Sequence, residues 1–262
     1  MAHIKVYELL KREYVPVTCE NEVSYGGRQQ WFSDKIVASK ATRLHKHGCG
    51  VIALADLFMY LSCTRSYIRS SSALESLEKD GKLLKENYLS YVEYVRDKYV
   101  YVLPKLGVPN IELIVAVNRY CLTHQLPYLA KMGYLIDQRV LLQNMITMLQ
   151  KDLPVILLIG KPFPRSLYQN VLKSKKVGVT FYEQRKNDEG YSYIPASINV
   201  EGHYVVVTGI LIDKEARQKK DKVMLKISSW GRIYYISYYE YCKYVIRYGT
   251  SLQGSIIHIV EK

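Results

Sequence analysis

The spacing of apolar and polar residues predicts helices in the first part of the chain. Residues 50–62 are apolar on almost every face, which is typical of a helix buried on all sides. Helical spacing continues in three further segments: residues 72–100, residues 111–124 with Asn110 as N-cap, and residues 137–151 with Asp137 as N-cap. The lead-in over residues 1–35 is expected to be irregular, with short extended pieces at residues 4–9 and 13–17.

The second part of the chain has the pattern of strands. The continuous apolar run at residues 155–159 is typical of a central strand. Further strands are expected at residues 203–212, 223–228, 232–237 and 255–260, with a charged hairpin tip at 214–222 and a short helix at 238–248. Residues 161–201 are punctuated by Pro, Lys and Gly and lack a period, so we expect a long loop or subdomain on the substrate side. Helices followed by a mostly antiparallel sheet predict an α+β fold.

The composition indicates a globular protein that can bury a sizeable core. Of the 262 residues, 48% are hydrophobic and 23% are charged, which is far from the composition of disordered chains. We expect a single domain over residues 1–262, with a helical half at about residues 36–150 and a sheet half at about 151–262.

The charge and the tyrosine content raise one hypothesis about partners. The formal net charge of +13 attracts polyanions at long range. The chain also has 25 tyrosines, and a basic, Tyr-rich face can stack on nucleic-acid bases. These tyrosines are dispersed over segments that also have the pattern of core elements, which favours half-buried packing over a nucleic-acid surface. No oligomeric state follows from the pattern.

The cysteine spacing and the N-terminal sequence both bear on the cellular compartment expected for this protein. The five cysteines are odd in number, widely spaced and without a CxxC motif, which argues against a disulfide framework and against a thiolate zinc site. The N-terminus lacks the apolar core of a signal peptide, and no apolar run approaches the roughly 20 residues of a membrane span. We therefore expect a cytoplasmic protein without a membrane span, in a reducing environment.

Cys49 is the residue best placed for nucleophilic chemistry. It lies in His47-Gly48-Cys49-Gly50, directly ahead of the apolar helix. The partial positive charge of a helix N-terminus favours thiolate over thiol, and the glycines let a substrate carbonyl approach the backbone closely. The position also suits a small buried cysteine, since free cysteines are among the most buried residues. Metal ligation by His45, His47 and Cys49 is a weaker alternative, because their spacing is no known zinc pattern.

His203 is the candidate base for this thiol. A thiolate nucleophile needs a base within hydrogen-bond reach and a third group that orients the base. His203 begins the apolar strand expected at residues 203–212, where it would be held rigidly. A hairpin closed near residues 216–219 places His203 opposite residues 228–232, so that a hydroxyl of Ser228-Ser229 could orient the ring and Trp230 could shield the pair from water.

Four motifs follow one another along the chain: Gly-Cys-Gly opening a buried helix, a helix leading into Leu-Pro-Val-Ile-Leu-Leu-Ile, then Gly-His-Tyr-Val-Val-Val-Thr-Gly-Ile, and finally Ser-Ser-Trp-Gly. In this order they resemble the papain-like cysteine peptidases, closest to the branch of bacteriocin-leader (double-glycine) peptidases and their stand-alone bacterial relatives. The matched blocks are residues 44–61, 138–160 and 202–236. The resemblance implies a papain-like fold, in which an N-terminal helical part packs on a C-terminal, mostly antiparallel sheet, with insertions at about residues 64–136 and 161–200.

The resemblance also implies roles for individual residues. Cys49 is the nucleophile, and His203 is the general base and acid. The family's third residue, an Asn two positions before the Trp, falls on Ser228. The family's oxyanion-hole glutamine stands about six residues before the cysteine, a position that is not Gln here, so Gln30, with Gln29 behind it, becomes the candidate side-chain donor beside the Cys49 backbone N–H.

Together these residues imply a thiol hydrolase, a peptidase or amidase that takes a peptide or amide substrate and needs no metal or organic cofactor. An acyltransferase using the same Cys49–His203 pair is an alternative, if the acceptor is an amine or thiol instead of water. Because Ser228 stands in place of the family's Asn, a non-catalytic binding protein on the same fold is a second alternative. Nucleic-acid binding through the basic, Tyr-rich surface is a third and least favoured one.

Overall fold

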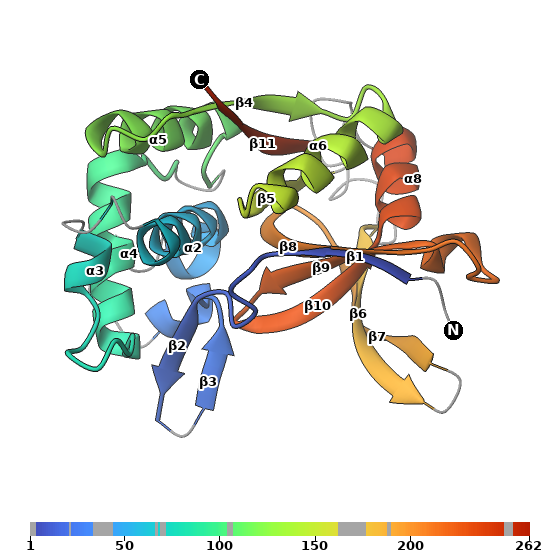
Figure 1. Ribbon diagram of the computed structural model, residues 1–262, viewed down its shortest axis with the longest axis horizontal. Helices are drawn as coiled ribbons and strands as arrows, with labels where there is room; N and C mark the ends of the chain where they lie inside the picture. The colour runs from blue at the N-terminus through green and yellow to red at the C-terminus, as the bar shows by residue number, and fades with distance from the viewer. Residues whose placement is uncertain are drawn as a thin grey trace, which may run out of the picture. The chain divides into compact units, whose positions relative to one another are not determined.

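The computed structural model describes residues 4–20, 22–33, 44–65, 68, 72–103, 107–161, 177–187, 190–248 and 254–262 (Figure 1). The chain divides into two compact units. The sheet unit comprises Met1–Leu9, Gly133–Ile227 and Ile233–Ile256. The helical unit comprises Leu10–Met132, Ser228–Arg232 and Ile257–Lys262.

The helical unit is organised around α2 (Cys49–Thr64). Every residue from Gly50 to Ser62 is buried, as the almost uninterrupted apolar sequence predicts. α2 packs against α3 (Ser72–Glu75), α4 (Lys85–Tyr99) and α5 (Asn110–Thr123). Aromatic rings fill the contact with α5, where Phe58 stacks on Tyr120 with 3.8 Å between ring centroids. Tyrosines such as Tyr120 therefore serve as core residues.

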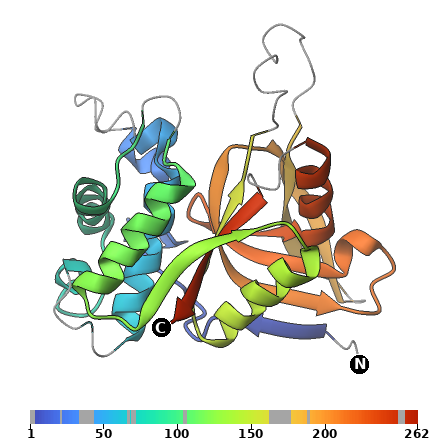
Figure 2. The same ribbon diagram turned by 90° about the horizontal axis from the view of Figure 1, so that it is seen from above.

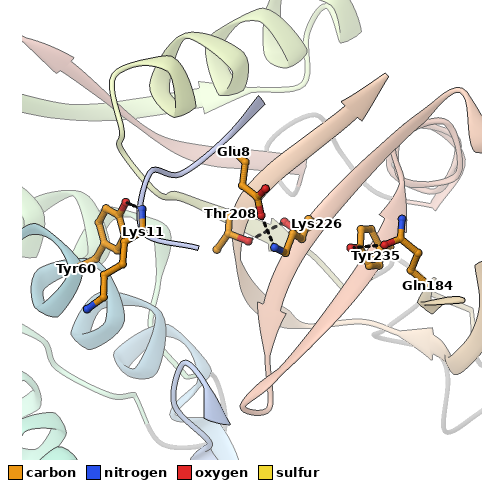
Figure 3. A network of polar contacts seen from close by, with 7 residues as sticks. All are labelled: Glu8, Lys11, Tyr60, Gln184, Thr208, Lys226 and Tyr235. Atoms are coloured by element: carbon orange, nitrogen blue, oxygen red, sulfur yellow. Dashed lines mark hydrogen bonds and ion pairs between the residues drawn. The ribbon is translucent and has the colours of Figure 1, made fainter. Parts of the chain in front are cut away.

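A small hairpin precedes α2 in the helical unit. β2 (Pro16–Cys19) pairs antiparallel with β3 (Glu22–Tyr25), and the 3₁₀ helix η1 (Gln29–Phe32) follows. Ahead of β2, the backbone N–H of Lys11 donates to the hydroxyl of Tyr60 at 3.4 Å (Figure 3). This bond fixes the start of the hairpin segment to α2.

The sheet unit is built on strands whose order is β5-β8-β9-β10-β6-β7. These strands are β5 (Val155–Ile159), β6 (Val179–Asn187), β7 (Gly190–Val200), β8 (His203–Asp213), β9 (Val223–Ser229) and β10 (Arg232–Ser237). β4 (Tyr128–Tyr134) and β11 (Gly254–Glu261), whose residues are divided between the two units, extend this order to β4-β11-β5. With β1 (Ile4–Glu8), the sheet has nine strands within the described residues.

The strand β8 is the centre of this sheet. Its first half pairs antiparallel with β5, from His203 opposite Ile159 to Val207 opposite Val155. Its second half pairs antiparallel with β1, along Gly209–Asp213. β1 and β5 therefore share one edge of β8, and β9 occupies the other.

Two helices pack on the sheet (Figure 2). α6 (Gln138–Gln150) contacts β1, β5 and β8, and α8 (Tyr238–Tyr248) contacts β6. Two tyrosine hydroxyls of α8 donate to carbonyl oxygens at the end of β5: Tyr241 to Leu158 at 3.1 Å, and Tyr244 to Gly160 at 2.7 Å. These bonds hold α8 beside the strand that pairs with His203.

Polar contacts also fasten the strands of the sheet unit to one another (Figure 3). The ammonium group of Lys226 on β9 donates to the carboxylate of Glu8 on β1, and both side chains are largely shielded from solvent. The hydroxyl of Thr208 on β8 lies 3.5 Å from the backbone oxygen of Lys226. These contacts link β1, β8 and β9 to one another.

Most of the expected elements are present. α2, β5, β8, β10, α8 and β11 occupy the predicted segments within one to two residues. Asp137 caps α6 as predicted, since its side chain accepts the Arg139 N–H at 2.7 Å. The charged hairpin tip is closed by the Asp213 N–H, which donates to the Lys222 carbonyl at 2.9 Å. The predicted α+β class is confirmed. No helix within the described part of the chain is long and apolar enough to cross a membrane.

Other expectations differ from the structure. The segment 161–201, expected to be a long loop or subdomain, contains the long hairpin β6–β7, while residues 162–176 lie outside the described residues. Much of β7 is exposed, so its sequence lacks the apolar period of a half-buried strand. The helix expected over residues 72–100 is broken between α3 and α4, where Gly81 has a φ of +81°. Asn110 is the first residue of α5, not its cap, which is Pro109. β4 has no counterpart among the expected strands.

Candidate active site

Cys49 is the first residue of α2, directly after the cap residue Gly48. The Gly48 N–H donates to the Leu44 carbonyl at 2.9 Å, and the Gly48 carbonyl accepts the Ile52 N–H at the same distance. A Cβ atom on Gly48 would lie 2.2 Å from the Leu44 carbonyl oxygen. Only glycine therefore fits immediately before Cys49, because the preceding helical turn packs directly against it.

The exposure of Cys49 differs from that of the rest of its helix. Residues Gly50–Ser62 are all buried, whereas Cys49 is half-buried. The N-terminus of a helix carries partial positive charge. The thiol thus stands at the end of a buried helix where an anion is favoured. None of the five cysteines forms a disulfide.

The two candidate glutamines lie in η1 of the same unit. Gln30 is exposed, whereas Gln29 is half-buried and its Oε1 is buried without a hydrogen-bond partner among the described residues. The neighbouring Trp31 is buried, with its ring edge-on to Tyr88 of α4 at 5.9 Å between centroids. Of the two glutamines, Gln29 is therefore the one turned inward.

Ser228 lies in the tip of the β9–β10 hairpin, which belongs to the helical unit. Its hydroxyl is buried and donates to the Tyr25 carbonyl at 2.7 Å, and the Tyr25 N–H donates to the Gly231 carbonyl at 2.9 Å. Trp230 and Gly231 have φ of +49° and +72°, as a tight type I′ hairpin turn requires. A tryptophan with positive φ is strained, and such residues gather at functional sites.

His203 is placed in the sheet unit, whereas Cys49, Gln29, Gln30 and Ser228 are in the helical unit. It begins β8 opposite Ile159 and is only 8% exposed. The ring of Phe181 lies 6.4 Å from the imidazole, centroid to centroid. Burial lowers the pKa of His203 from 6.5 to about 4, because an imidazolium is poorly solvated there. The ring is therefore neutral at pH 7 and one of its nitrogens has a lone pair, while the same burial disfavours the imidazolium that protonation forms.

One polar residue of α2 has no place among the sequence-derived candidates. Asp56 is 2% exposed and accepts hydrogen bonds from the Gly27 N–H, at 3.2 and 3.1 Å, and from the Tyr88 hydroxyl at 2.6 Å. Burial raises its pKa to about 7, although both hydrogen bonds act in the opposite direction. A signal for it exists in the sequence, because Asp56 is the one charged residue in the apolar run 50–62.

Within the described residues, no group of three or more His, Cys, Asp or Glu side chains is arranged to hold a metal ion. Comparison of the chain with protein-family models, with curated proteins and with solved structures gives no match.

Proposed function

We propose that this protein is a thiol hydrolase with a papain-like architecture, which cleaves a peptide or amide bond. Cys49 is the nucleophile and His203 is the base. The observation that carries the proposal is the position of Cys49: a partly accessible thiol on the first residue of a helix whose next 13 residues are all buried. A helix N-terminus stabilises a thiolate by its partial positive charge.

The proposed reaction has two stages. His203, neutral at pH 7, accepts the thiol proton, and the sulfur attacks the substrate carbonyl carbon to form a tetrahedral oxyanion. The C–N bond breaks as the imidazolium donates its proton to the leaving amine, which leaves a thioester on Cys49. Water then attacks the thioester with His203 again as base, and the acid is released. With an amine in place of water, the same steps transfer the acyl group.

Two observations in the helical unit support the roles proposed for Ser228 and for the oxyanion-hole glutamine. The Ser228 hydroxyl donates to the Tyr25 carbonyl, so its oxygen keeps lone pairs that can accept from an imidazole N–H. Gln29 is half-buried whereas Gln30 is exposed, so in our proposal the Nε2 of Gln29 replaces that of Gln30 as the side-chain donor to the oxyanion. Gln30, which is exposed, becomes the second candidate.

The test compares two thiols on one helix. Cys63 lies in the last turn of α2, and partial burial of its sulfur raises the pKa of its thiol. Iodoacetamide at pH 7, with peptide-resolved mass spectrometry, should alkylate Cys49 at least about tenfold faster than Cys63, since only thiolates react. His203→Ala should slow Cys49 and leave Cys63 unchanged. Equal rates for the two thiols, or no effect of His203→Ala, would contradict the Cys49–His203 pair.

A further inference from the structure

The buried carboxylate of Asp56 lies on the helix that carries Cys49. The two residues are seven positions apart, which is close to two helical turns, so they share one face of α2 about 10 Å apart along its axis. Both oxygens of Asp56 accept the Gly27 N–H, and one also accepts the Tyr88 hydroxyl. Asp56 therefore joins the segment after β3 to the helix of the proposed nucleophile.

The backbone of that segment approaches Asp56 more closely than a side chain would allow. Gly26 has a φ of +80°, and a Cβ atom there would lie 2.3 Å from Ser228 Oγ and 2.6 Å from Asp56 Oδ2. A Cβ atom on Gly27 would lie 1.9 Å from the Tyr88 hydroxyl oxygen. Two successive glycines are thus required where the chain passes between Asp56, Tyr88 and Ser228.

The same segment is held from its other side by the hairpin tip. The Tyr25 carbonyl accepts the Ser228 hydroxyl, and the Gly26 N–H donates to the Val15 carbonyl at 2.9 Å. The Arg28 side chain lies against Gly231 and over the Trp31 ring, 5.8 Å from its centroid. Beyond these contacts comes Gln29, with its inward amide oxygen. Gln29 lies only two residues along the chain from Gly27, whose N–H donates to Asp56.

We infer that Asp56 is a positioning residue, which clamps residues 25–29 to α2 and so sets where the Gln29 amide stands relative to Cys49. The inference rests on the proposed function, because it assigns the clamp to the oxyanion site of that reaction. Asp56 itself takes no part in the chemical steps. The groups that face it are Tyr88 of α4, Tyr14 ahead of β2, and Ser228 of the hairpin tip.

The experiment separates an oxyanion-forming reaction of Cys49 from one that forms no oxyanion. Acylation by p-nitrophenyl acetate passes through a tetrahedral oxyanion, whereas alkylation by iodoacetamide is a direct displacement at carbon. Asp56→Ala removes both acceptor oxygens and should lower the rate of Cys49 acylation about 100-fold, which is the typical effect of a misplaced catalytic group. The alkylation rate of Cys49 should stay within about twofold. Hydrogen exchange of residues 25–32 should increase in the same variant.

Further variants guard against a general loss of structure. Gly27→Ala breaks the clamp from the other side and should also lower acylation but not alkylation. Ser62→Ala is the matched control, since Ser62 is a buried residue of α2 whose hydroxyl bonds to Phe58 and Tyr120. It should change neither rate.

The outcomes are distinct. A selective loss of acylation supports the clamp. Equal losses of acylation and alkylation, or unchanged acylation in Asp56→Ala, would overturn it while the proposed nucleophile stands. Failure of the unmodified protein to acylate at Cys49 would overturn the proposed function, and the inference with it.

Discussion

Asp56 in the helical unit and His203 in the sheet unit are both buried ionisable side chains, yet burial acts on them in opposite directions. Burial raises the pKa of Asp56 to about 7 and lowers that of His203 to about 4, because each neutral form is favoured away from water. Asp56 accepts hydrogen bonds from two donors that favour its charged form, and burial still outweighs them. For His203, burial causes the shift. The comparison teaches that one physical effect gives the two units opposite responses to pH.

The signs follow from proton binding in the folded and unfolded states. Between pH 3.8 and about 7, folded Asp56 keeps a proton that the unfolded chain has lost, so its contribution to stability is lost as pH rises. Between about pH 4 and 6.5, unfolded His203 binds a proton that the folded form does not, so its contribution is lost as pH falls.

The largest expected effect comes from removing the charge of Asp56. Asp56→Asn cannot ionise, so the unmodified protein should lose up to about 4 kcal/mol of stability relative to this variant between pH 4 and pH 8. Urea unfolding at a series of pH values measures the difference. Asp80→Asn, at an exposed aspartate, should give a nearly constant difference over the same range. Parallel curves for Asp56→Asn would show that Asp56 is not buried as described.

The second largest expected effect comes from His203, and the pH dependence of stability has the opposite sign to that caused by Asp56. His203→Gln removes the ionisable ring, so the unmodified protein should lose up to about 3 kcal/mol relative to this variant as pH falls from 6.5 to 4. The same unfolding series measures it, and Asp56→Asn, which keeps His203, should retain this acid loss. A difference that stays constant below pH 6.5 would contradict the burial of a neutral His203.

The smallest expected effect comes from removing the tyrosine hydroxyl that donates to Asp56. Tyr88→Phe removes the hydroxyl that donates to Asp56 at 2.6 Å, which should destabilise the protein by about 1 kcal/mol and move the Asp56 midpoint above pH 7. The midpoint is taken from the unfolding series. Tyr120→Phe serves as the control, because its hydroxyl bonds to Ser62 further along α2. An unchanged midpoint in Tyr88→Phe would mean that the bond to Asp56 does not favour the charged form.

Part of the candidate site follows from local sequence and part does not. The start of α2 at Cys49 was predictable, because the apolar run begins there and glycine precedes it. The assignment of Ser228 depended on its place before Trp230, whereas its bond to Tyr25 joins residues 203 positions apart. The inward turn of Gln29, and not Gln30, depends on how residues 25–32 pack, which periodicity does not report.

The elements whose burial is nearly uniform, such as α2, β5 and the first half of β8, follow from the amino-acid sequence, because hydrophobicity alone specifies a fully buried segment. The α+β class likewise follows from the order of helices and strands along the sequence. Only the tertiary structure decided the β6–β7 hairpin and the partners of Asp56. The β6–β7 hairpin lacks a uniform apolar face, so the sequence pattern does not predict it. The partners of a buried polar group come from segments far apart in the chain, so the local sequence does not specify them. Asp56 can be recognised in the sequence as the one charged residue of an apolar run. Its hydrogen bonds to Gly27 and Tyr88 follow only from the folded structure.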